Sequence, residues 1–202
     1  GTYGDMEFTD GEATITLTGQ NDNCSKTATG LMYGTTYTVA QTAVDGFTTT
    51  IGSEEVSVKT ATINSEEATV AFTNTRQTGN LTVTNTVYPS DNDTDFEFTV
   101  ALTNAPITGT YGGMMFENGI ATVTLKGGGS AEATGLPTTV EYTVTQTAND
   151  DFSTTKTGDT GTISATLSVA AFKNIKLTEA RFDIDWHDGG NTSSRPEGLT
   201  TE

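Results

Sequence analysis

The densest group of possible metal ligands is the run 91–95, Asp-Asn-Asp-Thr-Asp, which places a carboxylate at every second position. Calcium loops use alternate oxygen ligands in this way. The full calcium-loop pattern also requires Gly at its sixth position and Glu at its twelfth, and these positions hold Phe96 and Leu102. We therefore interpret the run as a solvated turn, and we predict no metal site and no cofactor.

Side chains suited to catalysis are scarce. His187 is the single histidine, and one histidine without further His or Cys ligands cannot build a zinc site or a plausible Ser/His/Asp arrangement. We interpret it as a polar residue at a strand end. Cys24 is the single cysteine, which excludes an intrachain disulfide. It is interpreted as a small residue in a polar loop, with a reactive thiol as the alternative. We predict that the chain is not an enzyme.

The charge and composition of the chain exclude some classes of binding partner. The 202 residues carry 26 acidic and 9 basic side chains, for a formal net charge of -17. Displacing counterions from phosphate requires clustered Lys and Arg, so nucleic acid is excluded as a partner. No apolar run is long enough to span a bilayer, so we expect no membrane insertion within this segment. Frequent Thr and 22 glycines favour strands joined by tight turns.

The sequence repeats itself with a period of about 100 residues, which indicates two homologous domains. Short length differences in the loops separate the matching blocks. The pairs are residues 1–4 with 109–112, 12–17 with 120–125, 37–41 with 142–146, 47–50 with 152–155, and 71–74 with 171–174.

The two copies differ in completeness. The second copy, residues 79–177, is whole. The first, residues 1–78, has no counterpart of residues 79–108, so we expect a truncated domain that lacks its first two strands.

Residues 178–202 open a further, truncated repeat. Within them Phe182, Ile184 and Trp186 alternate with aspartates, as in a strand with one apolar face. Two explanations are open for the incomplete ends. The chain is an excerpt of a longer repeat array, which we favour, or the tail of one copy fills the gap in another by strand addition.

Apolar and polar residues alternate along the expected strands. Leu81 and Val83 share one face, and Ala121, Val123 and Leu125 alternate with threonines. A period of two bounded by Gly and Asn turns is typical of half-buried antiparallel strands. With seven or so short strands in a copy, the pattern predicts an all-β fold of tandem β-sandwich domains.

This combined pattern resembles the Cna protein B-type repeat and, more narrowly, the pilin isopeptide-linkage domains of Gram-positive bacteria. The resemblance covers nearly the whole chain and implies immunoglobulin-like sandwiches that serve as rod-like spacers in pili and adhesins. The residues that carry it are 79–87, 95–100, 109–112, 142–145 and 171–174, with 71–76 in the first copy and 182–188 and 195–197 in the tail.

Many members of that family carry a crosslink between a Lys on the first strand and an Asn on the last, assisted by a buried acid. The matching positions here hold Asn85 for the Lys, Gln146 for the acid and Asn174 for the Asn. Strand parity directs all three side chains into the sandwich.

An amide nitrogen is a poor nucleophile, and no acid remains to shuttle a proton. We therefore predict that the second copy forms no isopeptide bond and that its three amides hydrogen-bond to one another. The alternative is that they are polar core residues satisfied by the backbone. In the first copy Gln41 occupies the acid position and Asn74 the Asn position, which argues against a bond there too.

Three classes of function remain. The first, which we favour, is a structural spacer in the stalk of a bacterial surface adhesin or pilin, extracellular and anchored to the cell wall, whose partners are neighbouring repeats of the same polypeptide. The second is a module that recognises a host protein or glycan through loops such as residues 20–24. The third is an enzyme with these repeats as accessory domains, for which these residues supply no chemistry.

Overall fold

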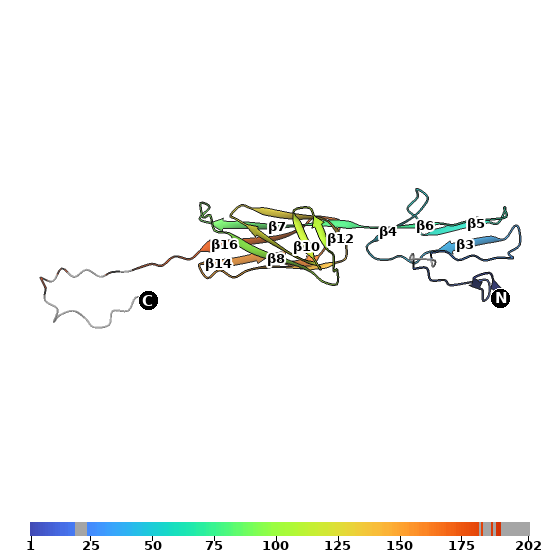
Figure 1. The fold of residues 1–202 in the computed structure, drawn as a ribbon, viewed down its shortest axis with the longest axis horizontal. Coiled ribbons are helices and arrows are strands. Elements are labelled where there is room, and N and C mark those ends of the chain that lie inside the picture. The colour runs from blue at the N-terminus through green and yellow to red at the C-terminus, as the bar shows by residue number, and fades with distance from the viewer. Residues whose placement is uncertain (19–23, 182, 184–186, 188, 191–202) are drawn as a thin grey trace.

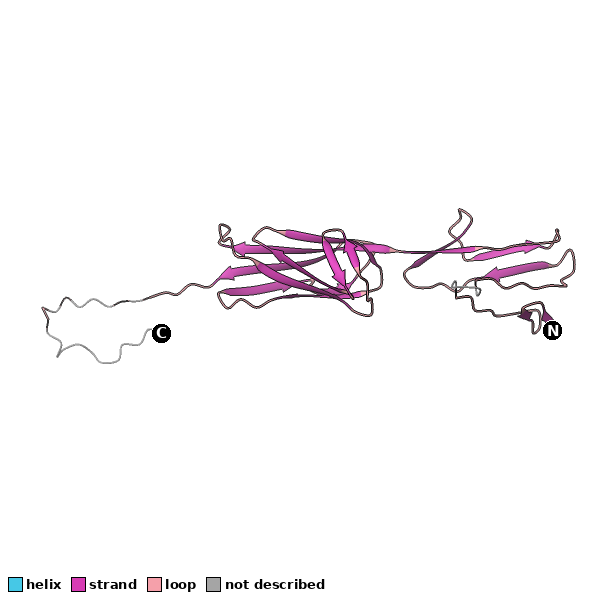
Figure 2. Ribbon diagram, in the orientation of Figure 1, coloured by secondary structure: helices cyan, strands magenta, loops and turns pink. Residues whose placement is uncertain are grey.

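The computed structural model describes residues 1–18, 24–181, 183, 187 and 189–190. These residues form sixteen strands and no helix (Figure 2), so the predicted all-β fold is confirmed. Within them no helix could span a bilayer.

Ten of the strands belong to residues 78–176 and form a sandwich of two sheets. They are β7 (Thr78–Tyr88), β8 (Phe96–Leu102), β9 (Gly109–Tyr111), β10 (Met114–Glu117), β11 (Ile120–Leu125), β12 (Ser130–Pro137), β13 (Glu141–Gln146), β14 (Phe152–Thr157), β15 (Thr160–Thr162) and β16 (Ser168–Lys176). One sheet has the order β15-β13-β8-β11-β10-β9, and the other has the order β12-β7-β16-β14. There are more strands than the seven or so expected, because tight turns divide the chain into short strands such as β9 and β10.

The hydrophobic core lies between these two sheets. Every fully buried apolar side chain of the described chain comes from residues 81–172. Phe98 of β8 packs edge-to-face on Phe172 of β16, with ring centroids 5.0 Å apart. Because these two strands belong to different sheets, this aromatic pair, which contributes about 0.5–1.5 kcal/mol beyond its buried area, holds the layers together.

The sandwich contains one parallel strand pair, β7 with β16, which runs from Leu81 opposite Ser168 to Tyr88 opposite Ile175. The remaining strand pairs of the sandwich are antiparallel. The chain enters through β7 and leaves through β16, so parallel pairing puts its entry and exit at opposite ends of the sandwich (Figure 1).

Residues 1–76 contain the other six strands, paired as β1-β2, β3-β5 and β4-β6. Their registers repeat those of the second half: Thr49 lies opposite Asn74, as Thr154 lies opposite Asn174. The strands are β1 (Thr2–Tyr3), β2 (Met6–Glu7), β3 (Thr36–Ala40), β4 (Phe47–Ile51), β5 (Val58–Thr62) and β6 (Phe72–Arg76).

The described part of this first half has no counterparts of β7, β8, β11 or β12. In the second half β11 pairs with β8, and β12 pairs with β7. Residues 12–17 and 25–32 match β11 and β12 in sequence position but form no strand. Their backbone groups lack the neighbouring strand that β8 or β7 supplies in the second half, which explains their irregular conformation.

Only Gln77 separates β6 from β7. Its N–H donates to the carbonyl of Gly46 at 2.8 Å, and its own carbonyl accepts from the N–H of Thr138 at 3.1 Å. Its side-chain Nε2 donates to Thr48 Oγ1 at 2.9 Å. This residue is therefore bonded to both halves, which lie end to end (Figure 1).

The pair Phe172 and Phe72 tests where the core lies. Phe172→Ala should lower the free energy of unfolding of the second half by about 3–5 kcal/mol, because its ring is buried in a packed core. Phe72→Ala should cost much less, because Phe72 is only half-buried. Chemical denaturation of the two variants provides the comparison, and equal losses would contradict this description of the core.

Candidate functional site

Three of the predicted site residues come from three strands and meet near one end of the second sandwich. Asn85 belongs to β7 and Asn174 to β16, which are neighbours in one sheet, whereas Gln146 ends β13 in the other sheet. Asn85 is 1% exposed and Asn174 0%, and Gln146 is half-buried. The cluster therefore links two adjacent strands and also the two layers.

Asn174 is the centre of the cluster. Its Nδ2 donates to Asn85 Oδ1 and to Gln146 Oε1, both at 2.9 Å. Its Oδ1 accepts from Gln146 Nε2 at 2.9 Å and from Thr154 Oγ1 at 2.5 Å. Both hydrogens and both lone pairs of this carboxamide are thus occupied, which is the full capacity of an Asn side chain.

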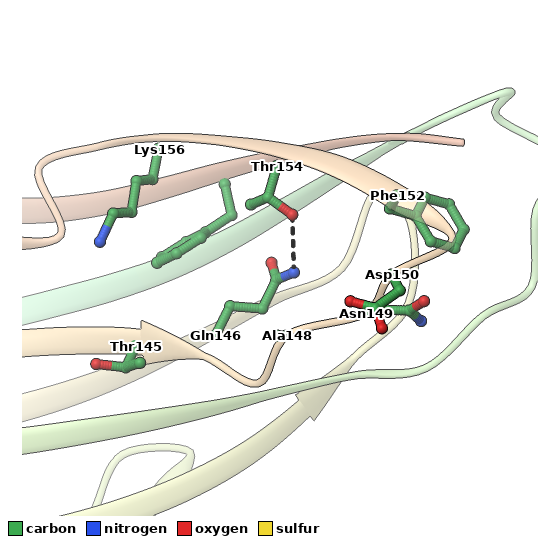
Figure 3. A pocket seen from close by; sticks show the side chains of 9 residues that line it. Thr145, Gln146, Ala148, Asn149, Asp150, Phe152, Thr154 and Lys156 are labelled. Atoms are coloured by element: carbon green, nitrogen blue, oxygen red, sulfur yellow. Dashed lines mark hydrogen bonds between the residues drawn. The ribbon is translucent and has the colours of Figure 1, made fainter. Parts of the chain in front are cut away.

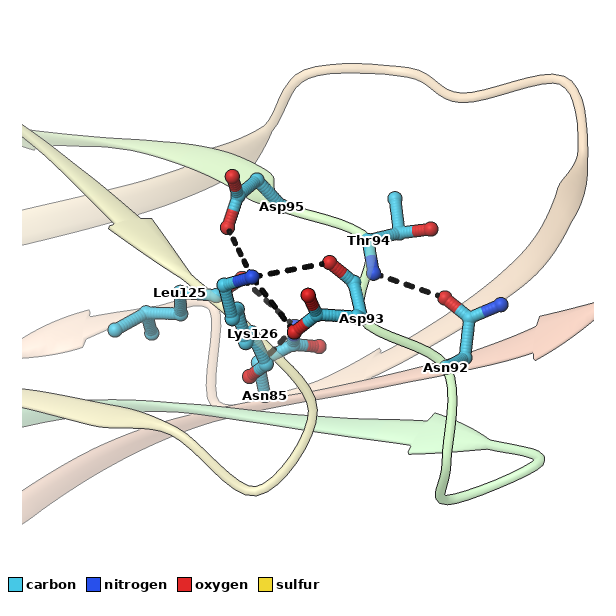
Figure 4. Close-up of polar contacts among 7 residues, drawn as sticks. All are labelled: Asn85, Asn92, Asp93, Thr94, Asp95, Leu125 and Lys126. Atoms are coloured by element: carbon cyan, nitrogen blue, oxygen red, sulfur yellow. Dashed lines mark hydrogen bonds and ion pairs between the residues drawn. The ribbon is translucent and has the colours of Figure 1, made fainter.

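Asn85 also bonds to the backbone. Its Nδ2 donates to the carbonyls of Leu125 and Lys126, each at 3.3 Å (Figure 4). Because the NH₂ group faces two acceptors, Oδ1 is the atom turned towards Asn174, and the orientation of the amide follows from the network. No buried side-chain nitrogen or oxygen of the described chain lacks a partner.

Thr154 is a member of the cluster that sequence reasoning missed. Gln146 Nε2 donates to its Oγ1 at 3.3 Å (Figure 3), and the same hydroxyl donates to Asn174. The signal that could have identified it is the repeat itself, because Thr49 stands at the matching place of the first copy. A shallow pocket beside Gln146 and Thr154 is lined also by Asp150, Phe152 and Lys156.

The first half contains the same arrangement without a counterpart of Asn85. Gln41 Nε2 donates to Asn74 Oδ1 at 2.6 Å and to Thr49 Oγ1 at 3.1 Å. Thr49 Oγ1 donates to Asn74 Oδ1 at 2.7 Å, and Asn74 Nδ2 returns a bond to Gln41 Oε1 at 3.2 Å. Unlike Asn174, Asn74 is exposed.

These contacts are suited to holding strands together. Transfer of the Asn174 acyl group to residue 85, with loss of ammonia, would need a neutral amine at position 85 and an acid at position 146, and both positions carry neutral amides. Each hydrogen bond instead contributes about 0.5–1.5 kcal/mol net to stability, while an amide left without partners in this buried place would cost about 1–3 kcal/mol. That no isopeptide bond forms stays a prediction.

The acidic run at residues 91–95 forms ion pairs with the side chain of Lys126. Lys126 Nζ lies 2.6 Å from Asp93 Oδ1 and 3.8 Å from Asp95 Oδ1 (Figure 4). The hydrogen bond to Asp93 is the main reason that the pKa of Lys126 is raised above its ordinary value. Asn92 Oδ1 accepts from the N–H of Thr94 at 3.0 Å and closes the turn. The described residues include no group of three or more His, Cys, Asp or Glu that could hold a metal.

The remaining sequence candidates lie apart from the cluster. Cys24 is a free, exposed thiol. His187 is exposed, and its neighbours Trp186 and Asp188 lie outside the described residues, as do Phe182 and Ile184 of the expected tail strand and most of the loop at 20–24.

Comparison with known proteins places the fold. The family described as "Domain of unknown function (DUF7601)" matches residues 1–76 and again residues 79–176. The major pilin protein T-13 from Streptococcus pyogenes is a similar solved structure, with 18% identity over 77% of this chain and 71% of that chain and a TM-score of 0.53. The several β-sheets of the chain thus match the β-sandwich domains of a pilin.

A second similar structure is the pilus-presented adhesin Spy0125 (Cpa), with 27% identity and a TM-score of 0.42. The match covers 49% of this chain and 27% of the adhesin chain, so the chain spans about a quarter of that protein. None of the curated proteins matches the chain.

Asn174→Ala should destabilise the second half by several kcal/mol, since it leaves Asn85, Gln146 and Thr154 with unpaired polar atoms at about 1–3 kcal/mol for each buried group. Asn74→Ala is the matched control and should have a much smaller effect, because Asn74 is exposed to water and its partners Gln41 and Thr49 are only half-buried. Chemical denaturation measures both. A loss for Asn174→Ala no larger than that for Asn74→Ala would contradict a stabilising role for the buried cluster.

Intact-mass measurement under denaturing conditions tests the predicted lack of a crosslink. The unmodified chain should have the mass of its sequence, because neither a nucleophilic amine nor a proton shuttle is present at the cluster. The double variant Asn85→Lys, Gln146→Glu supplies both groups and should lose one ammonia, since burial lowers the pKa of the new amine and favours its neutral form. An ammonia deficit in the unmodified chain would refute the prediction.

Proposed function

The chain belongs to the DUF7601 family, and on that premise we propose that it is a series of structural spacer repeats in the stalk of a bacterial cell-surface adhesin or pilin. The repeats are of the Cna B-type, with a truncated copy at residues 1–78, a complete copy at 79–177 and the start of another at 178–202. They act outside the cell, in a protein anchored to the cell wall, and they carry no catalytic activity.

The parallel pairing of β7 with β16 carries this proposal. A stalk is pulled along its length, so tension enters the second repeat through β7 and leaves through β16. Adjacent parallel strands pulled from opposite ends slide past each other, which loads their hydrogen bonds together. Separating a hairpin from one end would instead break the bonds one after another. The observed topology therefore resists tension along the chain.

The junction supports the same role. Gly46 has a φ of +77°, and a Cβ built on it would lie 3.3 Å from Thr138 Oγ1 of the second half. Together with the hydrogen bonds of Gln77, this close approach leaves little room for bending between the repeats. A stiff junction keeps a rod extended, as a spacer requires.

The amide cluster adds side-chain hydrogen bonds between β7 and β16, the two strands that would bear the tension. The bond from Asn174 to Asn85 joins β16 directly to β7, and Gln146 extends the tie to the second sheet. In this proposal the neighbouring repeats are the partners of each unit, and hydrogen bonds take the place that a covalent crosslink has in the resembling family.

A ligand-binding module stays the alternative prediction. Two aromatic residues that could mark a binding face pack on neighbouring rings instead: Tyr3 and Tyr111 lie edge-on to Phe8 and Phe116, each at 5.8 Å. Tyr33 is 76% exposed, and its hydroxyl donates to the carbonyl of Asn64. Nothing in these contacts selects a host protein or a glycan.

Single-molecule pulling tests the mechanical role. With handles at Thr78→Cys and Leu177→Cys the β7–β16 pair is sheared, whereas handles at Asp151→Cys and Leu177→Cys peel β14 from β16. Cys24 is replaced by Ser in both proteins, because it is an exposed thiol. We expect a clearly higher unfolding force in the first geometry. Equal forces in the two geometries would argue against a tension-bearing spacer.

A further inference from the structure

The joint between the two halves is a contact between the turn at residues 138–139 and the end of the first half. Thr138 is only 4% exposed. Its N–H and its Oγ1 both donate to the carbonyl of Gln77, at 3.1 and 3.3 Å. A Cβ built on Gly46 would lie 3.3 Å from Thr138 Oγ1 and 3.4 Å from Thr139 Oγ1. The turn and the first half therefore lie so close that position 46 has almost no room for a side chain.

The backbone of this turn is strained. Thr139 has a φ of +69°, in the left-handed region that a β-branched residue rarely adopts. Strain of this kind persists only where the surrounding structure fixes the backbone. The N–H of Thr139 donates to the carbonyl of Ile163 at 2.8 Å. Next to this bond, a Cβ at Gly79 would overlap the carbonyl of Ser164. The turn, residues 163–164 and the start of β7 therefore form one fixed surface where the chain enters the second sandwich.

On the side of the first half, Gly46 and Gln77 fix the place where the chain leaves. Gly46 has a φ of +77°, which glycine adopts without strain. Its carbonyl accepts from the N–H of Gln77 at 2.8 Å. Gln77 Nε2 donates to Thr48 Oγ1 at 2.9 Å, which attaches the same residue to β4. Because Gln77 is exposed, these bonds position the link between β6 and β7 rather than fill a core.

The end of the second half has the same backbone path but a different surface. Asp151 takes the place of Gly46, and Leu177 takes the place of Gln77. The N–H of Leu177 donates to the carbonyl of Asp151 at 2.7 Å, as the matching residues do at the end of the first half. Asp151 is not among the residues with positive φ, and it places a carboxylate where Gly46 has no side chain. Leu177 has no side-chain donor to replace Nε2 of Gln77.

We propose that the end of a repeat is a docking surface for the turn of the repeat that follows, and that positions 46 and 77 decide whether the two lock together. Gly and Gln, as in the first copy, give a stiff joint, whereas Asp and Leu, as at positions 151 and 177, do not. A Cβ at position 46 already lies 3.4 Å from the Thr138 carbonyl oxygen, so a carboxylate there would be buried beside an acceptor, which is unfavourable.

This inference rests on the spacer proposal and deepens it. Each joint of the stalk would be stiff or bendable according to two residues at the end of the preceding repeat. The joint seen between β6 and β7 is of the stiff type, and the end of β16 carries the residues of the bendable type.

Pulsed dipolar EPR on the full chain measures the stiffness of the joint. Spin labels are placed at Thr73→Cys of β6 and Thr86→Cys of β7, which are exposed positions, and Cys24→Ser removes the native thiol. If the chain stays extended through Gln77, thirteen residues at about 3.3 Å each separate the labelled positions by about 43 Å. We expect one narrow distance distribution near that value, whereas a bending joint would give a broad one that reaches shorter distances.

Two variants give the end of the first copy the residues of the second. Gly46→Asp should broaden the distribution at least about twofold, because its carboxylate meets the turn at 138–139. Gln77→Leu should broaden it less, since it removes only the side-chain bond to Thr48. Gly52→Asp is the matched control. Gly52 also has a positive φ, of +63°, but a Cβ there meets nothing within 4 Å, so the distribution should not change.

Three results would overturn the proposal. A broad distribution in the protein without these changes would show that the joint is not locked. An unchanged distribution in Gly46→Asp would show that position 46 does not set the joint. Equal broadening by Gly46→Asp and Gly52→Asp would assign the effect to backbone strain inside the first half, and hydrogen exchange at β4 and β6 reports whether that half stays folded in each variant.

The two proposals can fail separately. The pulling experiment loads the second sandwich alone, so equal forces there would argue against the spacer role whatever the joint does. A loose joint in the EPR experiment would refute the lock between the repeats, while leaving the resistance of the β7–β16 pair to tension as it was.

Discussion

The pairing of β7 with β16 is the interaction on which the second sandwich depends. β7 lies inside its sheet, with β16 on one side and β12 on the other. It contributes Leu81 and Val83 to the core and Asn85 to the amide cluster. β7 thus pairs with two strands and contributes side chains to the core. Through Asn85, which donates to the carbonyl of Leu125, it also connects the two sheets. The described first half has no counterpart of β7. There residues 25–32, which correspond to β12, are irregular, and Asn74, which corresponds to Asn174, is exposed.

The cluster shows how neutral groups can occupy a place that the resembling family fills with a lysine and an acid. Burying a charge requires a partner of good geometry, because desolvation costs several kcal/mol per ion. Amides avoid this cost, provided that every donor and acceptor is matched. Asn174 meets that condition through four hydrogen bonds. The arrangement is therefore stable without a proton shuttle, and its contribution does not depend on the titration of any member.

The sequence was sufficient for the fold class and for the inward direction of Asn85, because a period of two is a property of each strand by itself. It did not reveal Thr154, whose role depends on the register between β14 and β16. Nor did it reveal that Lys126, more than thirty positions away, closes the acidic turn. Both depend on which strands become neighbours, and alternation within one strand carries no information about its partner. Residues 12–17 illustrate the same limit, since their alternating pattern forms no strand.

Comparing the two halves shows separately what the local sequence and the neighbouring strands contribute to burial. Tyr37 and Tyr142 have the same residue type, are each followed by Thr-Val and lie at matching positions opposite β5 and β15, yet only Tyr142 is buried. Intrinsic propensity therefore cannot account for the difference, which resides in β7 and β8. Strand formation at residues 68–71 and burial of Asn74 depend on the same missing cover. In a repeat of this kind the first two strands, β7 and β8, each occupy an inner place in one of the two sheets, so the order of both sheets depends on them.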